Sequence, residues 1–162
     1  RAFTVNEAKT YLVEPYCVKL SGGRWYMLAR SVEKGRLLLY SFDRLEHVRT
    51  TEQKFELPRD FVAKDYFADF FGIVIDENVP LQRIVLRADK YHQYYMRTLP
   101  MHYSQRELFS CDDYADFELT LRPTYDFYMR LMSWGNMIKV LEPQSLQDEL
   151  RKWLRKTMEV YE

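Results

Sequence analysis

Basic and aromatic side chains alternate near the start of this 162-residue chain in a way that suits an anionic ligand. Tyr26 and Arg30 lie in residues 24–31, whose pattern predicts a β-strand, so both side chains are expected on one face of a sheet. Arg24 is expected on the same face, and three more basic residues lie in the neighbouring segments: Lys19, Arg36 and Arg44. Arginine and lysine form charge-assisted hydrogen bonds to phosphate, while an aromatic ring stacks on a base. The pattern predicts a site for a nucleotide-like ligand; its alternative is a solvated face on which long basic side chains cover aromatic surface.

A second group of candidate ligand-binding residues lies in residues 99–105. His102 and Gln105 carry side chains that can hydrogen-bond a ligand. The same side chains, with Ser104, can equally satisfy backbone groups where the following strand begins. Both interpretations stay open from the sequence.

No combination of residues predicts catalysis. The chain has three histidines, which are His47, His92 and His102. None of them pairs with an evident nucleophile and an orienting partner, and with Cys111 the last two give a spacing unlike the usual zinc patterns. The turn Ser21-Gly22-Gly23 lacks the helix and lysine that follow a phosphate-binding loop. The sequence therefore predicts a protein that is not an enzyme and that holds neither a cofactor nor a metal ion.

Composition predicts a globular protein without a strong charge bias. The chain has 24 Lys and Arg against 24 Asp and Glu, and 47% of its residues are hydrophobic. Residues 1–57 contain 10 basic and 7 acidic residues, an excess far below that of a domain that binds duplex DNA by itself. Two distant cysteines, no apolar run of about 20 residues and no signal-peptide pattern predict a cytoplasmic protein without a membrane partner. Because the chain begins with Arg1 rather than Met, we expect a piece of a longer polypeptide.

The first part of the chain reads as β-structure. Strands are expected at 16–20, 24–31 and 37–42, joined by glycine-containing turns, with a fourth and fifth strand at 45–48 and around Phe55. Short strands joined by tight turns predict a small barrel. The alternation in 24–31 places Trp25 with Met27 and Ala29 on the face opposite Tyr26, where Trp25 is expected in the core.

A helix and a polar loop are expected to separate two domains. Phe61 and the aromatic residues up to Phe71 recur at roughly helical spacing, which predicts a helix over 58–71 closed by Gly72. The polar residues 76–80 then form a loop, where we place the domain boundary.

The second part predicts the order β-α-β-β-α-β, typical of a ferredoxin-like sandwich. The expected strands are 81–88, 103–109, 114–122 and 137–141, and the expected helices are 89–97 and 124–134. A last helix is expected to begin near Ser145, with Asp148 at capping-box spacing. Its apolar stripe from Leu146 to Tyr161 either covers the sheet or pairs with a second subunit.

Several ordered motifs resemble the WYL family of bacterial proteins. In the first part they are Glu14-Pro15-Tyr16, Trp25-Tyr26-Met27-Leu28-Ala29 and Tyr40-Ser41-Phe42-Asp43-Arg44-Leu45. In the second part, marks of the C-terminal extension called WCX are His102-Tyr103-Ser104-Gln105, Ser133-Trp134-Gly135 and Val140-Leu141-Glu142-Pro143. The resemblance covers nearly the whole chain.

The resemblance implies an α+β protein with a WYL Sm-like, SH3-type β-barrel over 1–57, a linker helix and loop over 58–80, and a ferredoxin-like WCX extension with a C-terminal helix over 81–162. The first barrel strand is expected to be cut by the start of the chain. In such proteins a helix-turn-helix precedes the barrel and contacts duplex DNA. The barrel senses single-stranded nucleic acid or a nucleotide-like ligand and switches a dimeric transcription regulator. By this match Tyr26, Arg30 and Arg44 are the best ligand-contacting positions.

A second hypothesis from another functional class also stays open. The chain would then be an oligomerisation or protein-interaction domain without a small-ligand site. Its interface would consist of the tyrosines within 91–95 and the last helix.

Overall fold

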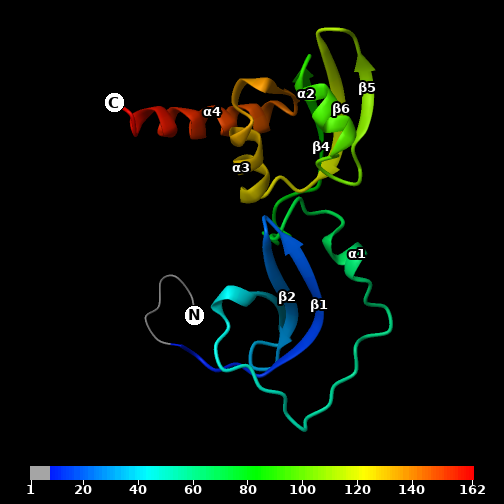
Figure 1. The fold of residues 1–162 in the computed structure, drawn as a ribbon, viewed down its shortest axis with the longest axis vertical. Helices are drawn as coiled ribbons and strands as arrows, with labels where there is room; N and C mark the ends of the chain where they lie inside the picture. Colours follow the sequence, from blue (N-terminus) through cyan, green and yellow to red (C-terminus); the bar gives the residue numbers. More distant parts are fainter. Residues whose placement is uncertain (1–7) are drawn as a thin grey trace. The chain divides into compact units, whose positions relative to one another are not determined.

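A computed structural model describes residues 8–162 as a mixed α/β chain with two antiparallel sheets and a C-terminal helix (Figure 1). The chain divides into two compact units, one ending at Tyr66 and the other beginning at Phe67. The division falls inside residues 58–80, the range predicted as a linker. The expected cut in a first barrel strand concerns the start of the chain, outside the described residues.

The first unit contains a three-stranded antiparallel sheet in the order β1-β2-β3. The strands are β1 (Val13–Ser21), β2 (Arg24–Ser31) and β3 (Arg36–Ser41), so the three strands expected first are confirmed. Gly22 and Gly23 join β1 to β2 with backbone φ angles of 55° and 75°. Two consecutive positive φ angles match the twist of a tight hairpin, and glycine adopts them without steric cost.

Among the described residues 8–162, no strand forms at 45–48 or around Phe55, so the predicted fourth and fifth strands are wrong. The chain leaves β3 through a short 3₁₀ helix, η1 (Phe42–Arg44), and is irregular at 45–48 and around Phe55. Phe55 instead packs through its ring, lying parallel to Tyr16 with centroids 6.5 Å apart, while Phe61 meets Tyr16 edge to face at 4.9 Å. Aromatic contacts thus hold this segment where strand pairing was expected, and the sheet is open.

The expected core position of Trp25 is also wrong. Trp25 is 50% exposed, and Leu20, its cross-strand partner, is 55% exposed. Both residues lie beside the Gly22-Gly23 turn at the end of the hairpin, where few neighbouring atoms can cover them. Burial does not alternate along β2, because the consecutive residues Leu28 and Ala29, which point to opposite faces, are both fully buried.

The helix expected over 58–71 is much shorter, because α1 comprises only Ala63–Phe67. Gly72 therefore does not end a helix. The Asp126 carboxylate approaches Gly72 so closely that a Cβ there would collide with it. Asp126 accepts hydrogen bonds from the next two backbone amides, Ile73 N at 2.8 Å and Val74 N at 3.2 Å. Close approach, rather than a helix cap, is thus the structural reason for a glycine at this position.

The second unit has the predicted order of elements. Its strands are β4 (Gln82–Asp89), β5 (Arg106–Ser110), β6 (Tyr114–Leu121) and β7 (Ile138–Glu142). Helix α2 (His92–Thr98) follows β4, and helix α3 (Tyr125–Ser133) followed by a 3₁₀ turn, η2 (Gly135–Met137), leads into β7. The strands pair antiparallel in the order β5-β6-β4-β7.

One face of this sheet forms the main hydrophobic core with the helices. Alternate residues of β4 and β6 are fully buried, as a period of two requires. They pack with Met96 of α2, Phe127 and Leu131 of α3, and Leu146 of the last helix. The other face carries a row of ion pairs across all four strands, because Glu118 binds Arg106 and Arg83, and Arg83 also binds Glu142.

The last helix, α4 (Gln144–Glu159), starts directly after Pro143. Ser145 therefore lies inside the helix, and the predicted capping box is wrong because Pro143, not Ser145, occupies the N-cap position. Leu146 is buried and Leu150 packs against the core, whereas Met158 is 63% exposed. The apolar stripe thus covers the core only with its first half, and Figure 1 shows the rest of α4 extending away from the second sheet. Among residues 8–162, no helix combines the length and apolar character needed to cross a membrane.

Replacing Asp126 by alanine is expected to destabilise the second unit. The Asp126 carboxylate accepts hydrogen bonds from the backbone amides of Ile73 and Val74. It also accepts one from the Thr124 hydroxyl, at 2.7 Å. Losing an acceptor for half-buried donors costs about 1–3 kcal/mol, measurable by urea unfolding followed by circular dichroism. Asp148→Ala, which removes an exposed carboxylate on α4, is the control and should change stability by less than about 0.5 kcal/mol. Equal losses in the two variants would contradict the assigned role.

Candidate ligand-binding site

Tyr26 lies in a row of three side chains that crosses the first sheet. In the strand register Tyr26 is opposite Lys19 of β1 and Ser41 of β3. Directly opposite residues of antiparallel strands point to the same face with Cβ atoms about 5 Å apart. Tyr26 and Lys19 are half-buried. The structure therefore brings together an aromatic ring and a predicted basic residue from separate strands.

Arg30 lies on the same face, two alternate positions further along β2. The separation from Tyr26 is about 13 Å at about 3.3 Å per residue, and the fully buried Leu28 lies between them. The guanidinium Nη1 of Arg30 is 3.0 Å from a carboxylate oxygen of Glu14, its cross-strand partner on β1. The predicted pair of Tyr26 and Arg30 is thus on one face but not in one contact.

Arg24 is a basic residue on this face, as the alternation predicts, although it was not among the ligand-contacting positions chosen from the sequence. It precedes Tyr26 by two residues and ion-pairs with Asp43 of η1 at 3.0 Å.

Asp43 ties the turn after β3 to this face. It accepts a hydrogen bond from the buried Ser41 hydroxyl and forms an ion pair with Arg24. The Ser41 hydrogen bond is the main cause that lowers the pKa of Asp43, and Arg24 and Arg44 lower it further. Asp43 is therefore ionised at neutral pH. Arg44 follows directly within η1, so these contacts also hold the turn that carries Arg44.

Arg36 lies at the opposite end of the sheet from Tyr26. It begins β3, is exposed, and is opposite Ser31, next to Arg30 in the strand register. A small open hollow adjoins this end of the sheet, and Glu14 and Lys54 are among the residues that line it. Lys19 and Arg24 thus lie near Tyr26, with Arg30 further along the same face, whereas Arg36 is in register with Ser31 and belongs to the opposite face of the sheet.

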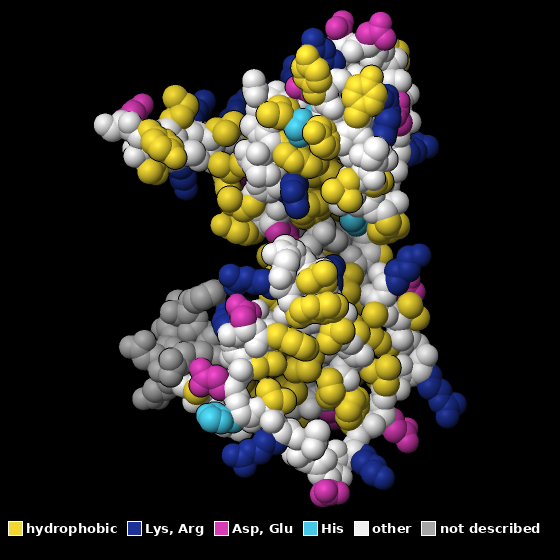
Figure 2. Space-filling model, viewed as in Figure 1, with side chains coloured by type: hydrophobic (Ala, Val, Ile, Leu, Met, Phe, Trp, Pro, Cys, Tyr) yellow, Lys and Arg dark blue, Asp and Glu magenta, His cyan; other side chains and the backbone are white. Residues whose placement is uncertain are grey.

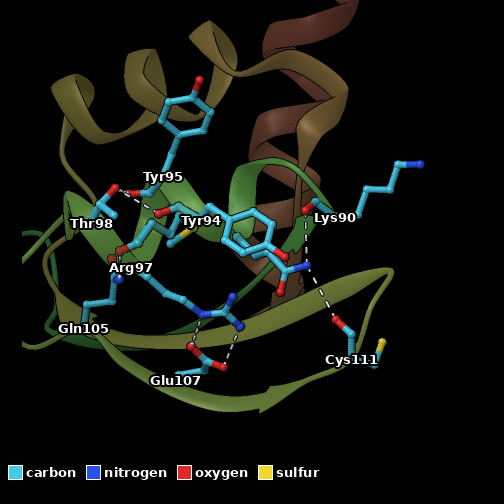
Figure 3. A network of polar contacts seen from close by, with 10 residues as sticks. Lys90, Tyr94, Tyr95, Arg97, Thr98, Gln105, Glu107 and Cys111 are labelled. Carbon is cyan, nitrogen blue, oxygen red and sulfur yellow. Dashed lines mark hydrogen bonds and ion pairs between the residues drawn. The ribbon is translucent and has the colours of Figure 1, made fainter.

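His102 and Gln105 lie in the second unit and bind backbone groups. The side-chain amide of Gln105 donates to the carbonyl of Met96 at 2.6 Å and accepts from Met101 N at 2.8 Å. Figure 3 shows Gln105 beside α2, with the Arg97–Glu107 ion pair next to it. These contacts fit the alternative in which Gln105 satisfies backbone groups, and a ligand role for it stays a prediction.

His102 is buried in the turn that Gln105 holds. Its Nδ1 atom is 2.7 Å from the Ser104 hydroxyl oxygen. Ser104 in turn accepts from Thr120 N at 2.9 Å and donates to the Thr120 carbonyl at 3.1 Å. The turn is thereby attached to the end of β6, and a ligand role for His102 also stays a prediction.

Comparison with known families matches residues 1–50 to the WYL domain and residues 80–158 to the WCX domain. The chain belongs to the WYL-domain family. The WYL match contains Lys19, Tyr26, Arg30, Arg36 and Arg44, and the WCX match contains the other two candidates. The presence of both domains supports a regulatory module of a transcriptional regulator, a class that is generally non-enzymatic.

Comparison with solved structures finds similarity to proteasome accessory factor B/C (PafBC) of Arthrobacter aurescens. The sequences are 20% identical, and the TM-score is 0.35. The match covers 92% of this chain but only 22% of PafBC, so the chain spans about a fifth of that protein's length. No curated protein matches the sequence.

Replacing Ser41 by alanine is expected to raise the pKa of Asp43 toward its ordinary value. The Ser41 hydrogen bond is the largest cause of the lowered pKa, so Arg24→Ala should raise it less. Because the folded pKa lies below the unfolded one, Asp43 stabilises the fold above its unfolded pKa and loses this contribution as the pH falls through the folded pKa. A carboxyl ¹³C NMR titration measures both shifts, and a larger effect of Arg24→Ala would contradict the assignment.

Proposed function

We propose that this chain is the ligand-sensing module of a bacterial transcriptional regulator. The WYL domain binds single-stranded nucleic acid or a nucleotide-like ligand, and binding switches a helix-turn-helix domain that lies outside this chain and contacts duplex DNA. The WYL and WCX matches support the regulatory part of this proposal. The regulator works in the cytoplasm, where such ligands and its target DNA occur.

The observation that carries the ligand assignment is the row of Lys19, Tyr26 and Ser41, with Arg24 beside it and Arg30 further along the same face. A tyrosine ring offers a stacking surface for a base, and the flanking cations offer contacts for phosphate. An aromatic side chain between cations on one face is what a single strand requires.

The spacing of these groups favours an extended ligand over a mononucleotide. Arg24 and Arg30 are six residues apart on β2, which is about 20 Å at about 3.3 Å per residue. One phosphate group cannot reach both guanidinium groups. The hollow near Glu14 has a cavity volume of about 30 Å³, far below the range of about 300–1,000 Å³ typical of small-molecule pockets. We therefore favour single-stranded nucleic acid.

We also propose the finer fold assignments that the family implies. The second unit is a ferredoxin-like sandwich, supported by its β-α-β-β-α-β connectivity and the strand order β5-β6-β4-β7. The first unit represents an Sm-like barrel of which β1, β2 and β3 form the described sheet.

Replacing Arg30 or Arg44 by alanine is expected to weaken binding of a fluorescein-labelled oligothymidylate of about 12 nucleotides, a length within the usual site sizes. Each lost phosphate contact should reduce affinity roughly 5- to 20-fold at low salt and lower the salt dependence. Fluorescence anisotropy with the intact protein measures both effects.

Arg151→Ala on α4 is the matched control, because Arg151 is exposed and paired to Asp148 much as Arg24 is to Asp43. Absence of saturable binding, or equal binding by wild type, Arg30→Ala and Arg44→Ala, would refute the ligand site.

The second candidate function is homodimerisation through the WCX domain. Tyr91, Tyr94 and Tyr95 are each more than 60% exposed around α2, as is Met158 on α4. Figure 2 shows hydrophobic side chains at the surface of the second unit, including along α4. Exposed tyrosines are frequent at protein interfaces, so a second copy of the chain is a partner that this surface suits.

Replacing Met158 by glutamate is expected to shift such a dimer toward monomer, because a charge buried in an apolar contact is strongly unfavourable. Light scattering measures the mass. Lys156→Gln, which changes the net charge by the same amount on the same helix, is the control and should leave the mass unchanged. Trp153 is a poorer position, since its ring stacks on Tyr128 within the chain at 5.4 Å. A dimer retained by Met158→Glu would exclude the far half of α4 as the main contact.

A further inference from the structure

Both arginines on the Tyr26 face of β2 are already engaged by carboxylates from neighbouring elements. Glu14 of β1 is 3.0 Å from Nη1 of Arg30, and Asp43 of η1 is 3.0 Å from Nη1 of Arg24. The four side chains belong to three different elements, which the antiparallel register and the turn after β3 bring together. Each carboxylate occupies a guanidinium N–H donor that a phosphate oxygen could otherwise accept from.

The two ion pairs are accessible to a competing anion. The side chains of Arg24 and Asp43 are 56% and 46% exposed, and those of Arg30 and Glu14 are 42% and 22% exposed. Ion pairs at this level of exposure contribute little to folding stability because solvent screens them. They can therefore open without unfolding the sheet.

Contacts other than the ion pairs also keep Glu14 and Asp43 near the two arginines. Asp43 accepts a hydrogen bond from the Ser41 hydroxyl in addition to the contact with Arg24, and the strand pairing of β1 places the backbone of Glu14 directly opposite Arg30. Their negative charges therefore remain beside the guanidinium groups when a ligand approaches.

We propose that Glu14 and Asp43 are built-in competitors that mask Arg30 and Arg24 until a polyanion displaces them. This inference rests on the proposed function, because it concerns regulation of the same ligand site. A single small anion gains one contact against one competing carboxylate, whereas an extended strand displaces both and adds stacking on Tyr26. The carboxylates thus set a threshold that favours single-stranded nucleic acid over free phosphate or a mononucleotide.

The size of the effect follows from the charge that is removed. A unit negative charge about 5 Å from a phosphate at a water-exposed site weakens binding roughly fourfold by Coulomb repulsion. Glu14→Gln and Asp43→Asn keep the side-chain shape while removing this charge. Each is expected to bind oligothymidylate about three- to fivefold more tightly than wild type because that repulsion is lost, and the double variant roughly tenfold or more tightly.

The test compares these variants with wild type by fluorescence anisotropy, using labelled oligothymidylate and, in parallel, inorganic phosphate as a competitor. Glu33→Gln is the matched control, because Glu33 is an exposed residue of the same unit that forms no ion pair with any residue within 8–162. It makes the same change in net charge and should leave the affinity within about twofold of wild type at ordinary salt.

A double-mutant cycle separates masking from general repulsion. If Glu14 acts by occupying Arg30, the gain from Glu14→Gln should largely disappear in an Arg30→Ala background. Loss of the gain supports the inference, as does oligonucleotide binding by the double variant when wild type binds too weakly to measure. Circular dichroism confirms that the variants are folded.

Two results would overturn masking while leaving the ligand site intact. In the first, the Glu14→Gln and Asp43→Asn variants bind oligothymidylate no more tightly than wild type, while Arg30→Ala binds it more weakly. The second is an equal gain from Glu33→Gln, which would assign the effect to net charge. Absence of binding by every variant, including the double one, would instead refute the proposed function and this inference with it.

Discussion

The tight turn at Gly22-Gly23 fixes the register between β1 and β2, and the candidate site depends on that register. The turn places Lys19 opposite Tyr26, and an irregularity between Pro15 and Cys17 then shifts the register by one residue, which brings Glu14 opposite Arg30. A slip of one residue would move every side chain of β1 to the other face of the sheet. The positive φ angles of both glycines make the hairpin short enough to prevent such a slip. Local backbone geometry thus determines which charges can meet on the Tyr26 face.

Arginine–carboxylate pairing across strands is the second principle shared by the two units. In the second sheet, Arg87 binds Asp116 through two hydrogen bonds of 2.7 and 2.8 Å, and its guanidinium lies 3.7 Å from the centre of the Tyr114 ring. Equal totals of basic and acidic residues in the chain allow this pairing. A cluster of arginines in the sequence is therefore not by itself a positively charged surface in the fold. The difference between the sheets is that the first combines its pairs with a half-buried tyrosine and a lysine in one row.

Short-range patterns predicted the elements well where a local signal defines both ends. The strand over 24–31 and the β-α-β-β-α-β order follow from alternation and from turn residues, and both are confirmed. The helix expected over 58–71 failed because aromatic residues at helical spacing here pack against distant rings and loops, as Phe71 does against Phe127. Gly72 was assigned to a cap because its real neighbour, Asp126, is 54 residues away in the sequence.

The sequence by itself determined the family, the order of elements in the second unit and the face that Tyr26 shares with Arg24 and Arg30, because these depend on motifs and on a period of two residues. Only the tertiary structure decided which charges meet. It paired Arg30 with Glu14 and Arg24 with Asp43, used Gln105 to hold a turn, and left Trp25 half-exposed. The physical reason is that an ion pair or a burial depends on atoms brought together by pairing between strands, and no spacing within one strand specifies them.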